Sequence, residues 1–236
     1  MASLPIGIHH AMVAASGGRV YVIGGFAGAI GQGVAQRRAF VLEGGRWREL
    51  PPMPEARAAA GVGALGGRLY VVGGVSERGL ARDTLVFNVG NERWSRRTGP
   101  TPREHLAVAT LKGKIYALGG RTAGLDSNLD LVERLNPRTG RWRALEPLPQ
   151  ARGGTGAASL GGRIVSVGGE GPGGTFARVF SFTPKRGRWQ RLAKLPTPRH
   201  GLGVAAVGNT LYVIGGGPEP GLTVSGANES LRIRAQ

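Results

Sequence analysis

The chain of 236 residues contains no cysteine, and it has few acidic or aromatic residues. Without cysteine it can form neither disulfides nor thiolate metal sites, and its redox compartment stays open. No apolar run approaches the length of a membrane span. The opening MASLPIGIHHAMVAASGG has too short an apolar run for a signal peptide, so export would require a signal peptide upstream of Met1. No window shows a sustained helical period, which argues against a helical fold.

Glycine, in contrast, is abundant and regularly placed. Five glycine pairs are spaced 46 to 49 residues apart, and each ends an apolar segment: RVYVIGG, RLYVVGG, KIYALGG, RIVSVGG and TLYVIGG. A tryptophan follows each of the first four pairs at a nearly constant distance: Trp47, Trp94, Trp142 and Trp189. A period of this length is typical of solenoids and propellers built from supersecondary units.

Each repeat predicts four antiparallel strands. The apolar segment before each glycine pair is the second strand, and a tight turn such as Gly66-Gly67 joins it to the first. The fourth strand carries the tryptophan, which we expect to be largely buried between repeats because a large aromatic at a fixed position fills a recurring gap. The third strands are expected at residues 39–42, 84–89, 129–135, 179–182 and 230–233.

These features predict an all-β chain in which every repeat forms one blade. We expect one domain, 1–236, with five repeats of four-stranded antiparallel blades at about 4–50, 51–98, 99–146, 147–193 and 194–236. No tryptophan strand follows residues 230–233, so the last blade lacks its outer strand. A glycine pair in this register, with a tryptophan about one half-period later, resembles the kelch repeat, and the resemblance covers almost the whole chain.

The resemblance implies a kelch β-propeller, most like bacterial kelch proteins with six blades. Pro54, Pro149 and Pro196 each follow a tryptophan by seven residues, and Pro5 holds the same place. A tryptophan preceding Pro5 at that distance would lie before Met1. We therefore expect a fragment that lacks an upstream blade, and the alternative is imperfect closure as five blades.

Antiparallel connectivity places two sets of loops on one face: those before the first strand and those after each glycine pair. In kelch domains these loops form the ligand-binding surface at the mouth of the central channel. The expected ligand-binding residues are His9, His10, Arg57, Arg103, Glu104, His105, Arg121, Arg152, Glu170, Arg199 and His200. For the repeated arginines the alternative is a structural role, pairing with neighbouring blades. Ligand contact is favoured for residues that differ between repeats, such as Arg121 and Glu170.

The net charge is +17, and the basic residues gather at the predicted hairpin turns of the opposite face. Such a surface attracts polyanions, but no nucleic-acid motif or row of exposed aromatics accompanies it, so nucleic acid is not favoured. The function that the sequence favours is a binding module for a protein segment or carbohydrate. Two alternatives stay open: a scaffold for an anionic polymer or surface, and a carbohydrate isomerase.

The isomerase alternative comes from the resemblance, because a six-bladed bacterial branch acts as a sialic acid mutarotase. Its chemistry needs an acid–base pair, which Glu104, Glu170 and the histidines could supply. No spacing marks such a pair, so we assign no catalytic residue. The copper and the cysteine-crosslinked tyrosine of galactose-oxidase-type propellers are excluded by the lack of cysteine. No metal and no cofactor are assigned.

Overall fold

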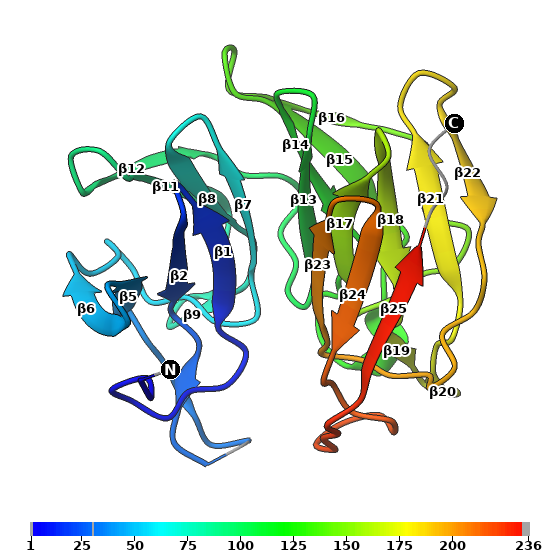
Figure 1. Cartoon of the computed structure of the whole chain (residues 1–236), viewed down its shortest axis with the longest axis horizontal. Helices are drawn as coiled ribbons and strands as arrows, with labels where there is room; N and C mark the ends of the chain where they lie inside the picture. Colours follow the sequence, from blue (N-terminus) through cyan, green and yellow to red (C-terminus); the bar gives the residue numbers. More distant parts are fainter. Residues whose placement is uncertain (1, 30, 233–236) are drawn as a thin grey trace. The chain divides into compact units, whose positions relative to one another are not determined.

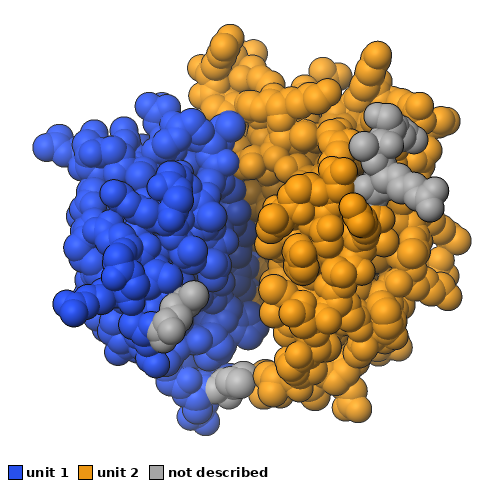
Figure 2. Space-filling view, in the orientation of Figure 1, with its two compact units in different colours: residues 1–104 blue, residues 105–236 orange. Residues whose placement is uncertain are grey.

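The structure, a computed structural model, describes residues 2–29 and 31–232 and is all-β apart from one short 3-10 helix. The chain forms two compact units, Met1–Glu104 and His105–Gln236, which are coloured separately in Figure 2. Among the described residues no helix has the length and apolar character that a membrane span requires.

Unit 1 holds two four-stranded antiparallel sheets (Figure 1). The first has the strand order β1-β2-β5-β6, with bounds Met12–Ser16, Arg19–Ile23, Ala39–Glu43 and Arg46–Leu50. The second has the order β7-β8-β11-β12, with bounds Gly61–Leu65, Arg68–Val72, Asp83–Asn88 and Arg93–Thr98. The loops after the glycine pairs form two small hairpins: β3 (Phe26–Ala27) with β4 (Val34–Ala35), and β9 (Val75–Ser76) with β10 (Gly79–Leu80).

Unit 2 holds three sheets. Its first two have the orders β13-β14-β15-β16 and β17-β18-β21-β22. Their bounds are Ala107–Leu111, Lys114–Leu118, Val132–Asn136, Arg141–Ala144, Gly156–Leu160, Arg163–Val167, Val179–Thr183 and Arg188–Arg191. The 3-10 helix η1 (Leu125–Ser127) and the hairpin of β19 (Glu170–Gly171) with β20 (Gly174–Thr175) follow their glycine pairs.

The last sheet of unit 2 has three described strands, in the order β23-β24-β25. Their bounds are Gly203–Val207, Thr210–Ile214 and Asn228–Arg232. The expectation of five antiparallel blades, the last lacking its outer strand, is confirmed for the described residues. The predicted third strand of this blade reached Ile233, which lies outside them.

The strands form where the pattern predicts because alternate side chains can be buried and the turns have suitable backbones. β7 pairs with β8 so that Leu65 faces Arg68, which leaves Gly66 and Gly67 as a two-residue turn with φ of 57° and 68°. Both glycines adopt the left-handed conformation that such hairpin turns require. Second-strand residues such as Tyr116 and Leu118 pack into an apolar cluster between neighbouring sheets.

Each of the first four glycine pairs contacts the loop that leads into the following repeat. The second glycine donates its backbone N–H to the carbonyl of the following repeat's arginine: Gly25 to Arg57, Gly74 to Arg103, Gly120 to Arg152 and Gly169 to Arg199, at 2.8 to 3.0 Å. Gly168, with φ of 62°, packs so closely that a Cβ there would lie 2.4 Å from the carbonyl oxygen of Arg199. Only glycine fits this approach.

The tryptophans are buried over most of their surface. All four lie in outer strands and are partly exposed, although Trp94 and Trp189 pack against apolar clusters. An outer strand has a neighbour on one edge only, so one side of the indole meets solvent. The indole N–H of Trp94 donates to the carbonyl of Pro51 at 2.8 Å, and that of Trp189 to the carbonyl of Glu146 at 3.0 Å. The expectation of largely buried tryptophans agrees with this intermediate burial, and the indole also joins its strand to the preceding loop.

Candidate functional site

The four repeated arginines have completely buried side chains, with exposed fractions of 0% for Arg57, Arg103, Arg152 and Arg199. Arg199 donates to the carbonyls of Gly215 and Val213 at 2.7 and 2.9 Å, and to Glu229 at 2.7 Å. Its guanidinium therefore ties the end of the second strand of its blade to the third strand. This arrangement favours the structural alternative for the arginines over direct ligand contact.

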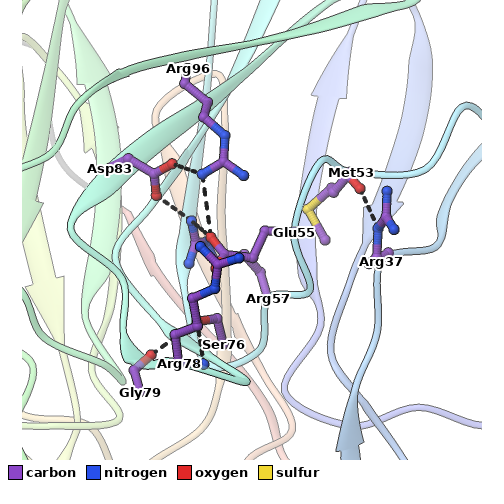
Figure 3. Close-up of polar contacts among 9 residues, drawn as sticks. All are labelled: Arg37, Met53, Glu55, Arg57, Ser76, Arg78, Gly79, Asp83 and Arg96. Atoms are coloured by element: carbon purple, nitrogen blue, oxygen red, sulfur yellow. Dashed lines mark hydrogen bonds and ion pairs between the residues drawn. The ribbon is translucent and has the colours of Figure 1, made fainter.

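In the second repeat the equivalent arginine belongs to a larger ionic cluster (Figure 3). Arg57 forms ion pairs with Asp83 and Glu55, and the same two carboxylates also bind Arg96, at 2.6 and 3.4 Å. Burial lowers the pKa of Arg57, while the charges of Asp83 and Glu55 oppose that shift. The carboxylates thus offset part of the cost of a buried guanidinium.

Arg152 lacks this compensation. It donates to the carbonyls of Gly168 and Arg178 at 2.9 and 3.0 Å, and its guanidinium lies over the Phe180 ring, 4.8 Å from the centroid. Burial, with a smaller contribution from the charge of Arg178, lowers its pKa to about 10. Hydrogen bonds and an aromatic face replace the carboxylate here.

The first repeat has Ile8 where the other four have the repeated arginine. In every repeat, the residue two places after this position has a left-handed backbone. The φ angles are 54° at His10, 51° at Ala59, 53° at His105, 61° at Gly154 and 60° at Gly201. These residues are linked from blade to blade, because Gly154 donates its N–H to the carbonyl of His105, Gly201 to that of Gly154, and Ala59 to that of His10. A left-handed backbone at histidine is uncommon and strained. Because hydrogen bonds hold the backbone in this conformation, it sets the direction of the Cα–Cβ bonds of His10 and His105.

In unit 1 the two predicted histidines of the first repeat come together with an aromatic residue. Nδ1 of His9 lies 2.6 Å from Nδ1 of His10, and both rings pack against Phe26, with centroids 5.4 and 5.9 Å away. His10 is exposed and His9 is partly buried. Glu104, at the end of the same unit, is also partly buried.

In unit 2 the predicted residues Arg121, Glu170 and His200 meet around one carboxylate. Arg121 donates to Oε1 of Glu170 at 2.9 Å, and Nδ1 of His200 lies 3.4 Å from the same oxygen. The backbone N–H of Gly221 donates to Oε2 at 3.1 Å. The side chain of Glu170 is only 2% exposed and that of Arg121 is 12% exposed. Each of the three consecutive blades of unit 2 therefore supplies one member of this group.

Asn128 completes the group, which we call the Glu170 cluster: Arg121, Asn128, Glu170, His200 and Gly221. Its side-chain amide donates to the backbone carbonyl of Glu170 at 2.6 Å. Sequence reasoning missed Asn128 because the loop after the third glycine pair differs in length from its equivalents and offers no repeat position to compare. A signal was present, since Asn128 lies within the post-glycine loop set that was predicted to form the mouth.

Two buried polar atoms of the Glu170 cluster have no hydrogen-bond partner: Nε2 of His200 and Oδ1 of Asn128. Burial lowers the pKa of His200, although the charge of Glu170 opposes the shift. His200 is therefore neutral at pH 7, and if Nδ1 carries the proton toward Glu170, Nε2 presents a lone pair. Oδ1 of Asn128 is a hydrogen-bond acceptor with either tautomer of His200. Within the described residues, no group of three His, Asp or Glu side chains is arranged to hold a metal ion.

Comparison with known proteins identifies the family. The family model of the KLHDC2/KLHL20/DRC7 Kelch-repeats domain matches residues 4–148, and that of the Kelch motif matches residues 151–196. The chain belongs to the kelch-repeat family. Kelch domains are protein-binding propeller modules, and the predicted kelch β-propeller architecture is confirmed.

Curated relatives agree with this assignment. The kelch domain is 28% identical to Kelch-like protein terF of Aspergillus terreus over 196 residues, which cover 76% of this chain and 42% of terF. It is 33% identical to Kelch-like protein 36 of Rattus norvegicus over 115 residues, 46% of this chain and 19% of that protein. It is also 33% identical to Kelch-like ECH-associated protein 1B of Danio rerio over 88 residues, 36% of this chain and 15% of that protein. The chain thus spans less than half the length of these relatives, which are fungal and vertebrate proteins.

Proposed function

We propose that this kelch domain binds a protein segment at the Glu170 cluster of unit 2. The observation that carries the proposal is the convergence of two unlike side chains, Arg121 and His200, from neighbouring blades on the buried carboxylate of Glu170. The residue after the glycine pair is Phe26, Val75, Arg121, Glu170 and Gly217 in the five repeats. A position that served only to build the blades could keep one residue type, as the glycine pair does.

The chemistry of the cluster favours a ligand that donates hydrogen bonds. Oδ1 of Asn128 is a buried acceptor without a hydrogen-bond partner, and Nε2 of His200 is a buried ring nitrogen without one; a buried polar atom left unsatisfied costs about 1–3 kcal/mol. Each is packed closely against a glycine: a Cβ on Gly217 would come within 2.8 Å of Nε2, and one on Gly153 within 2.7 Å of Oδ1. Peptide N–H groups and serine or threonine hydroxyls could donate to such an acceptor once the loop that covers it moves. The ion pair with Glu170 holds Arg121 in place at the partly exposed edge of the cluster.

A peptide array read with the purified 236-residue chain tests this function. We expect peptides that bind wild type to lose affinity after His200→Gln and Arg121→Ala. The control is Arg163→Ala, in a hairpin turn at the other end of the same sheets. Peptides that bind all three variants as tightly as wild type would refute the site. Because His200 and Arg121 also contact Glu170, circular dichroism melts must show that each variant is folded.

A second candidate function rests on exposed cations of unit 2. Six of them lie in or beside hairpin turns: Lys112, Arg138, Arg141, Lys185, Arg186 and Arg188. Such a surface suits an anionic polymer or membrane surface. Binding to heparin or anionic vesicles that falls steeply with salt, and that Arg186→Ala with Arg188→Ala weakens, would support this function.

Carbohydrate binding and isomerisation are alternative functions that we propose for the same cluster. Glu170 is the best-placed carboxylate of the cluster for acid–base chemistry, but Arg121 and the N–H of Gly221 already occupy its two oxygens. A glycan array tests carbohydrate binding. Proton-exchange NMR on reducing sugars tests isomerisation, and exchange accelerated by wild type and lost in Glu170→Gln would favour the enzyme. The likeness to bacterial six-bladed kelch proteins also stays a proposal.

A further inference from the structure

Two consecutive histidines of unit 1, His9 and His10, bring the same ring atom together. Nδ1 of His9 lies 2.6 Å from Nδ1 of His10, and the planes of the two rings make an angle of 74°. Only one proton fits between two imidazole nitrogens at this distance, so in the neutral pair one Nδ1 carries the proton and the other presents a lone pair. Neutral imidazole nitrogens are common metal ligands. Two of them at this separation are positioned to share one cation in place of the proton.

The backbone holds both residues of the pair in place. His9 donates its N–H to the carbonyl of Phe26 at 3.0 Å, and its own carbonyl accepts the N–H of Phe26 at 2.8 Å. His10 has φ of 54°, and its carbonyl accepts the N–H of Ala59 at 3.1 Å. The remaining freedom of the two rings is rotation about their side-chain bonds. Because χ2 of histidine is broad, each ring can turn its lone pair from the neighbouring ring to an ion.

The first repeat alone has two histidines at these positions. The equivalent pairs in the other repeats are Ala58-Ala59, Glu104-His105, Gly153-Gly154 and His200-Gly201. The second residue of each pair has a left-handed backbone, which glycine adopts without strain and histidine does not. The blade therefore does not require histidine at position 10. A strained residue that the fold does not need indicates a role for its side chain.

The separation of the two nitrogens indicates which metal fits. At a metal–nitrogen distance of about 2.0 Å, atoms 2.6 Å apart subtend an angle of about 80° at the ion. Neighbouring ligands of a square-planar or tetragonal ion lie at about 90°, whereas those of tetrahedral zinc lie at about 109° and need nitrogens about 3.3 Å apart. Square-planar and tetragonal sites are typical of Cu(II) and Ni(II), and Cu(II) has the highest affinity of the divalent first-row ions.

We propose that Nδ1 of His9 and Nδ1 of His10 form a chelating site for Cu(II). His10 is exposed, so the ion reaches the pair from solvent and water completes its coordination. Nε2 of His9 is buried without a hydrogen-bond partner, whereas a metal-binding histidine normally donates its second N–H to an acceptor. We therefore expect moderate affinity, below that of a structural metal site. The pair belongs to unit 1, and the proposal does not depend on the ligand of the Glu170 cluster.

Titration of the purified 236-residue chain with Cu(II), against glycine as a competing chelator, tests the site. We expect one equivalent to bind more tightly than any further copper. Pulsed EPR of that complex should show two imidazoles coupled to the ion. This measurement uses the wild-type chain, so it does not depend on how any variant folds. A spectrum with one coupled imidazole, or with none, would overturn the proposal.

Matched asparagine variants locate the ion. His10→Asn and His105→Asn each remove one imidazole from a left-handed position, with φ of 54° and 53°, and asparagine tolerates that conformation. His10→Asn should weaken the first Cu(II) equivalent at least about tenfold, since even the loss of an outer-shell partner commonly costs that much. His105→Asn should leave both the affinity and the EPR spectrum unchanged. Equal effects of the two variants, or unchanged copper affinity in His10→Asn, would show that the ion binds elsewhere.

Zn(II) provides the control metal for the geometry. Because the two nitrogens are too close together for tetrahedral coordination, one equivalent of Zn(II) should leave the copper EPR signal of the wild-type complex unchanged. Ni(II), which accepts the same geometry, should bind the wild-type chain more weakly than Cu(II) and should lose affinity in His10→Asn. Displacement of copper by an equal concentration of Zn(II) would refute the assignment to Cu(II).

Discussion

Arg178 occupies in the fourth repeat the position that Asp83 occupies in the second. Val72 pairs with Thr84, the residue after Asp83, and Val167 pairs in the same way with Val179, the residue after Arg178. Where Asp83 forms an ion pair with the buried Arg57, Arg178 offers Arg152 only its backbone carbonyl. The fourth blade therefore buries a guanidinium beside a second cation, and burial together with that cation lowers the pKa of Arg152 to about 10.

Installing the missing carboxylate should stabilise the protein. We expect Arg178→Asp to raise the free energy of unfolding by about 1–2 kcal/mol, because a charge-assisted hydrogen bond would compensate Arg152. Urea denaturation at pH 7 measures the change, with Arg178→Ala as the control that removes the repulsion without adding a carboxylate. The folded-state pKa of Arg152 is depressed, so its penalty is complete below pH 10 and declines above it. The advantage of Arg178→Asp should therefore shrink above pH 10, and an Asp variant no more stable than the Ala variant would contradict this account.

Replacing one of the repeated arginines should lower the free energy of unfolding strongly, even in the absence of any ligand. Arg199→Met leaves Glu229 without its cationic partner and the carbonyls of Gly215 and Val213 without a donor. Breaking a buried ion pair on one side costs about 3–5 kcal/mol. The control is Arg188→Met, in an exposed outer strand position, which should change the free energy of unfolding by less than about 0.5 kcal/mol. Equal effects of the two substitutions would show that Arg199 does not hold its blade.

Two glycines with nearly the same φ angle allow the cost of backbone strain to be measured apart from the cost of a steric clash. Gly168 and Gly201 have φ of 62° and 60°, but a Cβ at Gly168 would lie 2.4 Å from a carbonyl oxygen, whereas at Gly201 it would meet nothing within 4 Å. Gly201→Ala should cost about 1 kcal/mol through backbone strain alone. Gly168→Ala should cost several times more, since the contact between blades must open. Thermal melts of the two variants provide the comparison, and similar shifts would refute the close-packing argument.

The partly exposed tryptophans should contribute less than fully buried ones. Trp94→Ala should cost about 2–3 kcal/mol, below the range of about 3–5 kcal/mol for buried aromatics. Trp94→Phe keeps the ring against Phe87, whose centroid lies 4.8 Å away, and should cost about 1 kcal/mol for the lost hydrogen bond to Pro51. Urea denaturation of both variants tests how the stabilisation is divided between the packing of the ring and the hydrogen bond of the indole. A phenylalanine variant as unstable as the alanine variant would mean that the hydrogen bond dominates.

Much of the fold was predictable because its determinants are local and repeated. The turn Gly66-Gly67, the apolar strand Arg68–Val72 and the tryptophan strand Arg93–Thr98 each follow from residues close in sequence. Repetition in register turned weak local signals into a strong one. The exposure of Trp94 was not predictable in the same way, since it depends on what covers an outer strand.

The candidate site was predictable in position but not in chemistry. Topology placed Arg121, Glu170 and His200 on one face, in two sets of loops, and the structure brings them together in unit 2. Their contacts depend on loop paths that no repeat fixes, as Asn128 illustrates. The arginines illustrate the converse: for a repeated polar residue at a loop, the sequence left both ligand binding and a structural role open, and only the structure shows that its length lets it reach inward to carbonyls such as that of Gly215.

The titration of His200 should be visible in the pH dependence of stability. Burial lowers its folded-state pKa, and the nearby charges of His105 and Arg121 act in the same direction, while Glu170 and the carbonyl of Glu219 act against it. As the pH falls below about 6.5, the usual histidine pKa, the unfolded state takes up the proton first. The protein should therefore lose stability between pH 6.5 and the lower folded-state pKa.

The variant His200→Gln isolates that contribution, because it keeps a polar side chain without the titration. We expect its free energy of unfolding, measured in urea from pH 7 to pH 5, to fall less steeply than that of wild type. His200→Asn is a second non-titrating variant, and its curve should run parallel to that of His200→Gln. If wild type and His200→Gln ran parallel instead, His200 would be free to protonate in the folded state. The neutral ring, and with it the acceptor proposed for the ligand, would then have to be abandoned.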